Sequence, residues 1–198
     1  MTPGIRPPVP GSVLPPMLRL FVAAYPTIEV ARELARIVGS ADLPPCRMTV
    51  PEQIHLTLLF IGDTERTRLN DVIESVERST AGVGPFMLTP MRLIVLPDRG
   101  RTPPRLVAAE TDSPPGMLEI QRRLASRLAR TARGRAGDRF RPHLTLCRFV
   151  PGGPAGRVGG LGSIGHVPAF EVSHVSLMHS TLGPGGARHA EVARAVLG

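Results

Sequence analysis

Lysine and tryptophan are absent from this sequence of 198 residues, which contains only two cysteines. Cys46 and Cys147 form no CxxC pair and provide no disulfide framework, a usage typical of the reduced cytoplasm. Aromatic residues make up 4% of the chain, so nucleic-acid binding by stacking bases on several exposed rings is not expected. No segment approaches the roughly 20 consecutive apolar residues of a membrane span. These absences predict a cytoplasmic protein that does not cross a membrane.

Arginine supplies all of the basic charge, with 24 basic against 16 acidic residues and a net charge of +8. A surface of this sign attracts phosphate groups such as those of RNA. Coding bias toward arginine accounts for the same composition, so the charge is compatible with an anionic partner without identifying one. The arginines of the helix predicted over 114–133 either guide RNA or form an ordinary solvated face.

The chain is long enough for one domain with a buried core, and its content of 42% hydrophobic and 20% charged residues is typical of globular proteins. Residues 1–16 hold six prolines and predict a disordered tail. We expect a single domain of two lobes over 17–198. Hydrophobic periodicity predicts helices over 27–38, 63–80 and 114–133, and strands over 18–25, 53–62, 86–97, 105–111, 141–150, 169–182 and 187–196.

The phrase HLTLLF at 55–60 returns as HLTLCR at 143–148. By composition a histidine is followed by Leu-Thr-Leu only about once in a thousand, so two such cases indicate a repeat. In an extended strand His55 and Thr57 share one face while the leucines share the other, and the same holds for His143 and Thr145. Because strand, helix and motif strand also recur in the same order, the sequence predicts an internally duplicated α+β fold.

Two such strands facing each other would line a cleft with two imidazoles and two hydroxyls. Imidazole titrates near pH 6.5, so one ring can accept a proton while the other donates one, as general acid–base catalysis requires. This equipment suits phosphodiester cleavage, with the threonines bonding the non-bridging oxygens and a guanidinium offsetting charge at phosphorus. The two phrases are nearly interchangeable, so the residues leave open which histidine is the acid.

Other chemistries lack the residues that they need. A catalytic zinc site would require a third histidine or a carboxylate at ligand spacing, whereas threonine stands two positions after each motif histidine. The sequence contains no G-x-S-x-G elbow, no cysteine-protease signature, no Walker A loop and no dinucleotide fingerprint. We therefore expect neither a metal nor a cofactor.

The paired H-x-T-x motifs, with RLFVAAY near the start and FRPHLTLCRF around the second copy, resemble the 2H phosphoesterase superfamily, and within it the RNA 2′,3′-cyclic phosphodiesterases, also called 2′-5′ RNA ligases. The resemblance spans about 18–196. It implies a bilobal, pseudo-twofold α+β fold with two antiparallel sheets, flanked by helices, around a central cleft. It also implies an RNA-processing hydrolase that opens a terminal 2′,3′-cyclic phosphate to a 2′-phosphomonoester without metal.

The resemblance implies roles for six residues. His55 matches the proton donor to the leaving 3′-oxygen and His143 the acceptor that activates water, while Thr57 and Thr145 match the phosphate-binding hydroxyls. Arg148 matches a basic residue that binds substrate in the second motif, and Phe60 is its counterpart in the first. Strict alternation from His143 turns Arg148 away, so Arg148 reaches phosphate only if the strand bulges or ends there.

Alternatives remain at this point. A monomer acting on RNA termini is the expected form, but the substrate of the same catalytic groups could instead be a small cyclic nucleotide or an ADP-ribose cyclic phosphate. A module that binds RNA or nucleotide phosphates without turnover would also use the positive charge. The segment GGARHAEV places His189 where an aromatic residue is expected. His166, His174, His179 and His189 lack the motif and are expected to be structural or exposed.

Overall fold

The computed structural model describes residues 15–97, 103–128, 140–150, 161, 164–183 and 186–198. Most of the predicted tail, residues 1–14, therefore lies outside the described residues. Three α-helices are described: α1 (Ile28–Gly39), α2 (Leu69–Thr80) and α3 (Pro115–Leu128). The described strands are β1 (Met17–Ala24), β2 (Cys46–Met48), β3 (Leu56–Glu65), β4 (Phe86–Leu88), β5 (Pro90–Leu96), β6 (Leu106–Thr111), β7 (His143–Phe149), β8 (Phe170–Val172), β9 (His174–Gly183) and β10 (Gly186–Val196).

All strand pairs are antiparallel. The larger sheet has the order β10-β9-β1-β3-β7-β6-β5, with β2 also paired to β7, and the smaller sheet pairs β4 with β8. This arrangement confirms the predicted α+β class with two antiparallel sheets. None of the helices in the described ranges is long and apolar enough to cross a membrane.

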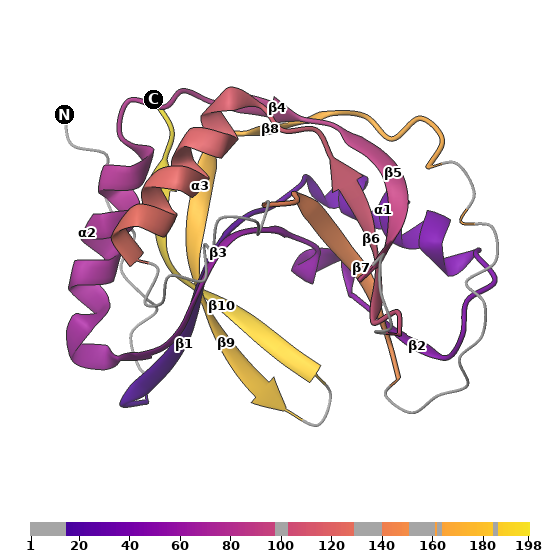
Figure 1. The fold of residues 1–198 in the computed structure, drawn as a ribbon, viewed down its shortest axis with the longest axis horizontal. Coiled ribbons are helices and arrows are strands. Elements are labelled where there is room, and N and C mark those ends of the chain that lie inside the picture. The colour runs from indigo at the N-terminus through magenta and orange to yellow at the C-terminus, as the bar shows by residue number, and fades with distance from the viewer. Residues whose placement is uncertain (1–14, 98–102, 129–139, 151–160, 162–163, 184–185) are drawn as a thin grey trace.

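The two motif strands meet at the centre of the larger sheet. The pairing of β3 with β7 is confined to Leu56 opposite Leu144, and from this point the two halves of the sheet diverge (Figure 1). The helices are exchanged between the halves: α1 follows β1 but contacts β7, whereas α3 follows β6 but contacts β3. This crossed packing ties the two copies of the repeat together and fixes the motif strands against each other.

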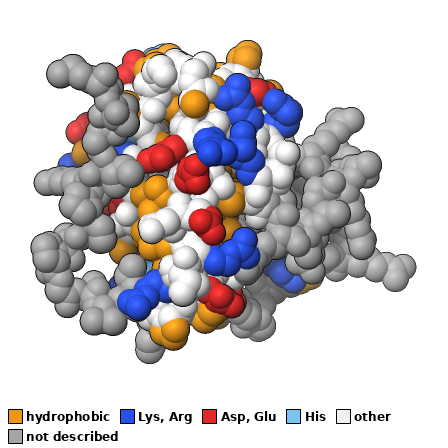
Figure 2. All heavy atoms as spheres, turned by 90° about the vertical axis from the view of Figure 1, so that its left-hand side faces the viewer, with side chains coloured by type: hydrophobic (Ala, Val, Ile, Leu, Met, Phe, Trp, Pro, Cys, Tyr) orange, Lys and Arg blue, Asp and Glu red, His pale blue; other side chains and the backbone are white. Residues whose placement is uncertain are grey.

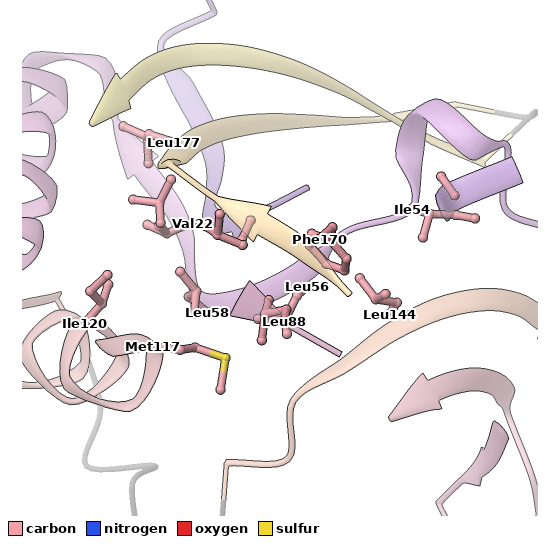
Figure 3. Close-up of a cluster of buried hydrophobic side chains, with 14 of the residues drawn as sticks. Val22, Ile54, Leu56, Leu58, Leu88, Met117, Ile120, Leu144, Phe170 and Leu177 are labelled. Carbon is pink, nitrogen blue, oxygen red and sulfur yellow. The ribbon is translucent and has the colours of Figure 1, made fainter. Parts of the chain in front are cut away.

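The core is built from the leucine faces of the motif strands. Leu56, Leu58, Leu144 and Leu146 are all buried and belong to one hydrophobic cluster, to which α3 contributes Met117 and Ile120 and the smaller sheet contributes Leu88 and Phe170, as Figure 3 shows. At about 25 cal/mol per Å² of apolar surface removed from water, burial of this cluster is the main stabilising term. The opposite face of each strand is left for polar groups.

The first residues of α1 and α2 are determined in different ways. Thr27 caps α1, and its side chain accepts a hydrogen bond from the backbone nitrogen of Val30 at 3.4 Å. The helix predicted from residue 63 begins only at Leu69, because β3 continues through Gly62 to Glu65 and pairs with β1 as far as Met17. Gly62 has φ +86°, a conformation that glycine adopts without strain. The ladder with β1 thus outweighs the turn signal of this glycine.

Two predicted strands are each divided in the structure. The segment 86–97 forms β4 and β5, separated at Thr89, whose backbone nitrogen donates to the Asp112 carboxylate at 2.8 Å instead of to a strand. The segment 169–182 forms β8 and β9, which belong to different sheets. These breaks let one stretch of sequence serve both sheets.

The outer face of α2 and α3 carries charges of both signs, which are intermingled in Figure 2. On α3, Arg122 and Arg123 both pair with Glu119, at 2.8 and 2.7 Å, and Arg123 also donates to the carbonyl of Ala81. Arg130 and Arg133, predicted on the same face, lie outside the described residues. The described arginines at 122 and 123 are thus engaged in ion pairs on the helix.

Candidate active site

Each motif histidine is held by the backbone carbonyl two residues before it. Nδ1 of His55 donates to the carbonyl of Gln53 at 2.7 Å, and Nδ1 of His143 donates to the carbonyl of Arg141 at 2.8 Å. A carbonyl oxygen only accepts, so the hydrogen of each neutral ring is on Nδ1 and Nε2 keeps its lone pair. Both rings are therefore oriented alike, with Nε2 available to a substrate.

The supports of the two carbonyls differ. Gln53 ends a short 3-10 turn, Pro51–Gln53, which is separated from His55 only by the buried Ile54. Arg141 is instead tied down by its side chain, which pairs with Glu110 of β6 at 2.6 Å, and Glu110 lies directly opposite His143 in the sheet. A backbone turn thus anchors one imidazole and a cross-strand ion pair anchors the other.

The four motif residues lie on one face of the sheet, which we call the site face. His55, Thr57, His143 and Thr145 are half-buried, while the leucines between them are buried in the core. The antiparallel pairing at Leu56 and Leu144 places each histidine next to the threonine of the other copy. Two imidazoles and two hydroxyls are thereby brought together around a local twofold axis.

A β-bulge in β7 turns Arg148 toward the site face. Val107 of β6 pairs with Cys147 and Ala108 with Thr145, so Leu146 is an extra residue in β7. As a result Leu146 and Cys147, although consecutive, are both buried in the core. The alternation is reversed from there, which is the condition that the sequence set for Arg148 to reach a phosphate.

The first motif strand, β3, contains a β-bulge of the same kind. Val22 of β1 pairs with Leu59 and Ala23 with Thr57, so β3 has an extra residue at Leu58. Phe60 consequently lies on the site face, with 52% of its surface exposed, and the guanidinium of Arg19 stands 5.0 Å from the centre of its ring. Phe60 and Arg148 thus occupy equivalent positions in the two motif strands, but the side chain of Phe60 is apolar and that of Arg148 is charged.

His55 is enclosed by aromatic rings. Its ring centre lies 5.0 Å from that of Phe21, 5.4 Å from Tyr25 and 5.1 Å from His189. Phe21 also packs edge-on against His189 at 4.8 Å, and with Ala23 and Met178 forms a second small apolar cluster. These contacts remove His55 from water on the side facing β9 and β10.

Burial lowers the pKa of His55 to about 4, because a charged ring loses hydration in this enclosure. The positive charges of His189, Arg148 and His143 lower this pKa further, against the carbonyl of Gln53, which raises it. His55 is therefore neutral at pH 7 in the free protein. The positive charge of Arg148 contributes to the lowered pKa of both His55 and His189.

A pocket of about 200 Å³ adjoins this ring cluster. Its lining includes Tyr25, Gln53, His174, Ser176, His189 and Glu191. The carboxylate of Glu191 accepts from Ser176 at 2.6 Å and pairs with Arg194 at 3.0 Å. Burial, followed by the charge of Glu191, raises the pKa of Tyr25 to about 12, so its hydroxyl remains a donor. The pocket is polar, partly aromatic and large enough for a small group of a ligand.

His189 is the site residue that sequence reasoning missed. It was expected to be structural or exposed, yet its ring contacts both His55 and Phe21 and lines the pocket. Its Nδ1 is buried and has no hydrogen-bond partner among the residues that the structure describes, and burial lowers the pKa of His189. The available signal was its position in the last strand, where an aromatic ring was expected. Histidine provides that ring in a form that can also bond to a ligand.

Among the described residues, no group of three or more histidine, cysteine, aspartate or glutamate side chains is placed to hold a metal ion. Polar side chains close to His55 include Tyr25 and His189, whose rings contact it, and Thr145, which lies opposite it in the paired strand. The described groups are therefore suited to moving protons and holding anions.

Comparison with known proteins connects this geometry to a family. A family model described as LigT like Phosphoesterase matches residues 26–104, which include the first motif. Among solved structures, that of TT0787 of Thermus thermophilus has a TM-score of 0.75 at 24% identity, covering 91% of this chain and 98% of that one. Escherichia coli LigT complexed with 3′-AMP has a TM-score of 0.75 at 22% identity, covering 92% and 99%. These structures share the fold.

Relatives in sequence match a longer part of the chain than the family model does. The protein named RNA 2′,3′-cyclic phosphodiesterase from Methanothermobacter thermautotrophicus is 30% identical over 142 residues, which is 69% of this chain and 74% of the relative. A protein of the same name from Aquifex aeolicus is 27% identical over 142 residues, or 67% of this chain and 71% of the relative. On these grounds the chain belongs to the LigT-like family of 2H phosphoesterases.

Proposed function

We propose that this protein hydrolyses the 2′,3′-cyclic phosphodiester at the end of an RNA to a 2′-phosphomonoester, without a metal ion. The observation that carries the proposal is the placement of two imidazoles on paired strands, each with Nδ1 anchored on a carbonyl and Nε2 left for substrate. The names of the sequence relatives agree with this substrate. The solved structures of E. coli LigT complexed with 3′-AMP and with phosphate agree with the ligand class.

In the proposed mechanism both histidines act through Nε2. His143 accepts a proton from water as its oxygen attacks phosphorus, and the bond from phosphorus to the 3′-oxygen breaks. His55 donates its Nε2 proton to that oxygen. In each turnover His143 thus gains one proton and His55 loses one. The hydroxyls of Thr57 and Thr145 donate to the non-bridging oxygens, and Arg148 offsets the charge that builds on them.

His55 must first become protonated, and the substrate itself can bring this about. At pH 7 a ring with a pKa of about 4 pays about 4 kcal/mol for its proton. A phosphate anion about 4 Å away returns about 4 kcal/mol at an effective dielectric constant of about 20. The bound phosphodiester is thus sufficient to charge its own acid catalyst. With the anion bound, the pKa of His55 is therefore raised toward about 7, where a general acid can both hold a proton and release it to the leaving oxygen.

In this proposal the pocket beside His55 holds a part of the terminal nucleoside, because its volume of about 200 Å³ suits a small group of a ligand. The leaving 3′-oxygen belongs to the same ribose as the cyclic phosphate, so that ribose must lie on the side of the proton donor. Tyr25 and His189 line the pocket and contact His55, which connects the donor directly to the space for the nucleoside.

The direct test uses an RNA ending in a 2′,3′-cyclic phosphate, incubated with the protein in EDTA and followed by phosphorus NMR. We expect the cyclic signal to be replaced by that of a 2′-phosphomonoester. A cyclic signal that persists would reject the proposal, and a 3′-phosphomonoester would reject the assigned pose and the roles of His55 and His143.

The net charge of +8 supports a second candidate, a module that binds RNA or nucleotide phosphates without turnover. It predicts salt-sensitive binding that is the same in the wild type and in His55→Ala and His143→Ala, with no product from any of the three. Product formation by the wild type that is lost in both variants would exclude it.

A further inference from the structure

We propose that the pocket beside His55 binds the base of the terminal nucleotide and selects guanine, with Glu191 and Glu52 as the residues that determine this specificity. The inference rests on the proposed function and deepens it, because it names the terminal nucleotide that the site prefers and leaves the acid–base chemistry unchanged.

The register of the strands places the pocket on the site face. Ser176 of β9 stands opposite Ala23 of β1, and Ala23 stands opposite Thr57 of β3. Residues directly opposite one another in antiparallel strands project on the same side of the sheet. Ser176, which lines the pocket, therefore shares the site face with Thr57. The pocket thus continues the surface on which the phosphate is proposed to bind.

A β-bulge in β10 brings Glu191 and Arg194 to this face together. Glu191 pairs with Met178 of β9. Arg194, three positions later, pairs with Ser176, which is only two positions from Met178. The extra residue in β10 is Val192. Strict alternation would have turned Arg194 away from Glu191, so the bulge is what builds their ion pair into the wall of the pocket.

The carboxylate of Glu191 is held in place but keeps an oxygen that can accept from a ligand. Oε2 accepts from the Ser176 hydroxyl at 2.6 Å and from Nη2 of Arg194 at 3.0 Å. Within the described part of the chain, Oε1 accepts only from Nε of Arg194, at 3.2 Å, and Nε lies at the same distance from Oε2. A carboxylate oxygen has room for two hydrogen bonds. Oε1 can therefore accept one more, from a ligand in the pocket.

Two further polar groups of the pocket are available to a ligand. Glu52 and Tyr25 both line it, and neither the carboxylate nor the hydroxyl has a hydrogen bond or ion pair with any residue that the structure describes. An ionised carboxylate only accepts, whereas a phenol hydroxyl can donate its hydrogen. The pocket therefore offers two acceptors, on Glu191 and Glu52, beside one donor, on Tyr25.

Guanine is the RNA base whose edge matches this set. Its Watson–Crick edge presents two neighbouring donors, N1–H and the N2 amino group, next to one acceptor, O6. Adenine, cytosine and uracil each present a single donor on that edge, and this is the edge by which proteins bind unpaired RNA bases. In the proposed complex the two carboxylates accept from N1–H and the N2 amino group, and Tyr25 donates to O6. Any other base leaves one carboxylate desolvated without a partner, which is costly.

The test uses four RNAs that differ only in the terminal nucleotide, which carries the 2′,3′-cyclic phosphate and is guanosine, inosine, adenosine or cytidine. For the wild type we expect kcat/KM to be about 10- to 100-fold higher with guanosine than with adenosine or cytidine, as for loss of one charge-assisted hydrogen bond. Inosine lacks the N2 amino group and should lie between them.

The variant Glu191→Gln should reduce the preference for guanosine over adenosine to less than about threefold. Arg194 holds the remaining amide oxygen, and an amide nitrogen cannot accept from the base. Glu52→Gln should reduce the preference in the same direction. Because the preference is a ratio measured on one protein, a loss of folded protein cancels. Glu171→Gln is the matched control, because Glu171 is an exposed carboxylate on β8 in the smaller sheet, and it should keep the wild-type preference.

A binding measurement separates recognition of the base from catalysis. In calorimetry, guanosine 2′-phosphate should bind the wild type at least about tenfold more tightly than adenosine 2′-phosphate. Glu191→Gln should remove most of this difference.

Equal kcat/KM on the four RNAs, a preference for another base, or a guanosine preference that Glu191→Gln retains would overturn the guanine pocket and leave the hydrolase intact. A wild type that hydrolyses none of the RNAs rejects the proposed function, and the calorimetry then decides by itself whether the pocket selects guanosine. A guanosine preference that is lost in Glu191→Gln and kept in Glu171→Gln supports the pocket.

Discussion

His55 and His143 occupy equivalent positions on two equivalent strands, yet their surroundings differ. Both donate Nδ1 to the carbonyl two residues back, and both are followed by a threonine and a bulge. His55 contacts three other rings, whereas His143 contacts none among the described residues and is backed by the ion pair of Arg141 with Glu110. The repeated motif therefore supplies two equivalent histidines, and the neighbouring strands give these histidines different surroundings.

This difference bears on the division of labour between acid and base. The rings around His55 come from β1 and β10 and from the residue after β1, and the repeat has no corresponding rings on the side of His143 among the described residues. Enclosure makes His55 hard to protonate in the free protein, and a bound phosphate anion raises the pKa of this ring so that it can carry the proton. The asymmetry thus couples protonation of one histidine to substrate binding. The predictions below test that asymmetry in order of decreasing effect.

Removal of either histidine should lower kcat by about 10²-fold or more, as for loss of a general acid or base. The two losses should diverge on a nucleoside phosphodiester with a 4-nitrophenyl leaving group, which departs without a proton. His55→Ala should recover most of its activity on this ester, whereas His143→Ala should not. Nitrophenolate absorbance provides the measurement. If only His143→Ala recovered activity on this ester, His143 would be the proton donor and His55 the proton acceptor.

Enclosure of His55 should also make stability depend on pH. Its pKa is about 4 in the folded protein and near 6.5 in the unfolded chain, so the unfolded chain binds the proton more tightly. The free energy of unfolding should therefore fall as pH decreases from about 6.5 to about 4, by about 3 kcal/mol from this residue. Urea unfolding at a series of pH values measures it. His55→Asn should lack this part of the decline, and an identical slope in both proteins would contradict the enclosure.

The residues at the bulges should differ in the same asymmetric way. Arg148→Met should lower kcat/KM by about 10- to 100-fold, because a guanidinium next to the phosphate is lost, and Arg148→Lys should lower it less. Phe60→Leu, at the equivalent site in β3, should change it by less than about threefold. Steady-state kinetics on the cyclic substrate decides between them. Equal losses at both positions would show that the two sides of the phosphate are held alike.

The repeat made much of this architecture predictable. Alternation placed His55, Thr57, His143 and Thr145 on one face, and the recurring order of strand, helix and motif strand indicated the duplicated α+β fold. Local signals were also sufficient for the helix predicted over 27–38, whose N-cap at Thr27 is decided within one turn of helix. These features depend on neighbours in sequence, which the sequence displays.

Features that depend on pairing between distant strands were not predictable. Gly62 suggested a strand end, but the ladder from Met17 to Ala24 holds β3 extended beyond it. The bulge at Leu146 was identified only as a condition for Arg148, because an extra residue is defined by the partner strand and not by the strand itself. His189 was overlooked for the same reason, since its contacts with His55 and Phe21 join strands far apart in the chain.

His189 allows the finest test of the asymmetry. His189→Ala removes both a ring that excludes water from His55 and a nearby charge, and each of these lowers the pKa of His55. The pKa of His55, followed by NMR of its ring protons, should rise by about one unit toward 6.5. His189→Phe keeps the ring without the charge and should raise it less. Addition of a nucleoside 2′-phosphate should raise the pKa in all three proteins. If His189→Ala left the value in the free protein unchanged, enclosure by Phe21 and Tyr25 alone would account for it, and His189 would serve the ligand rather than the acid.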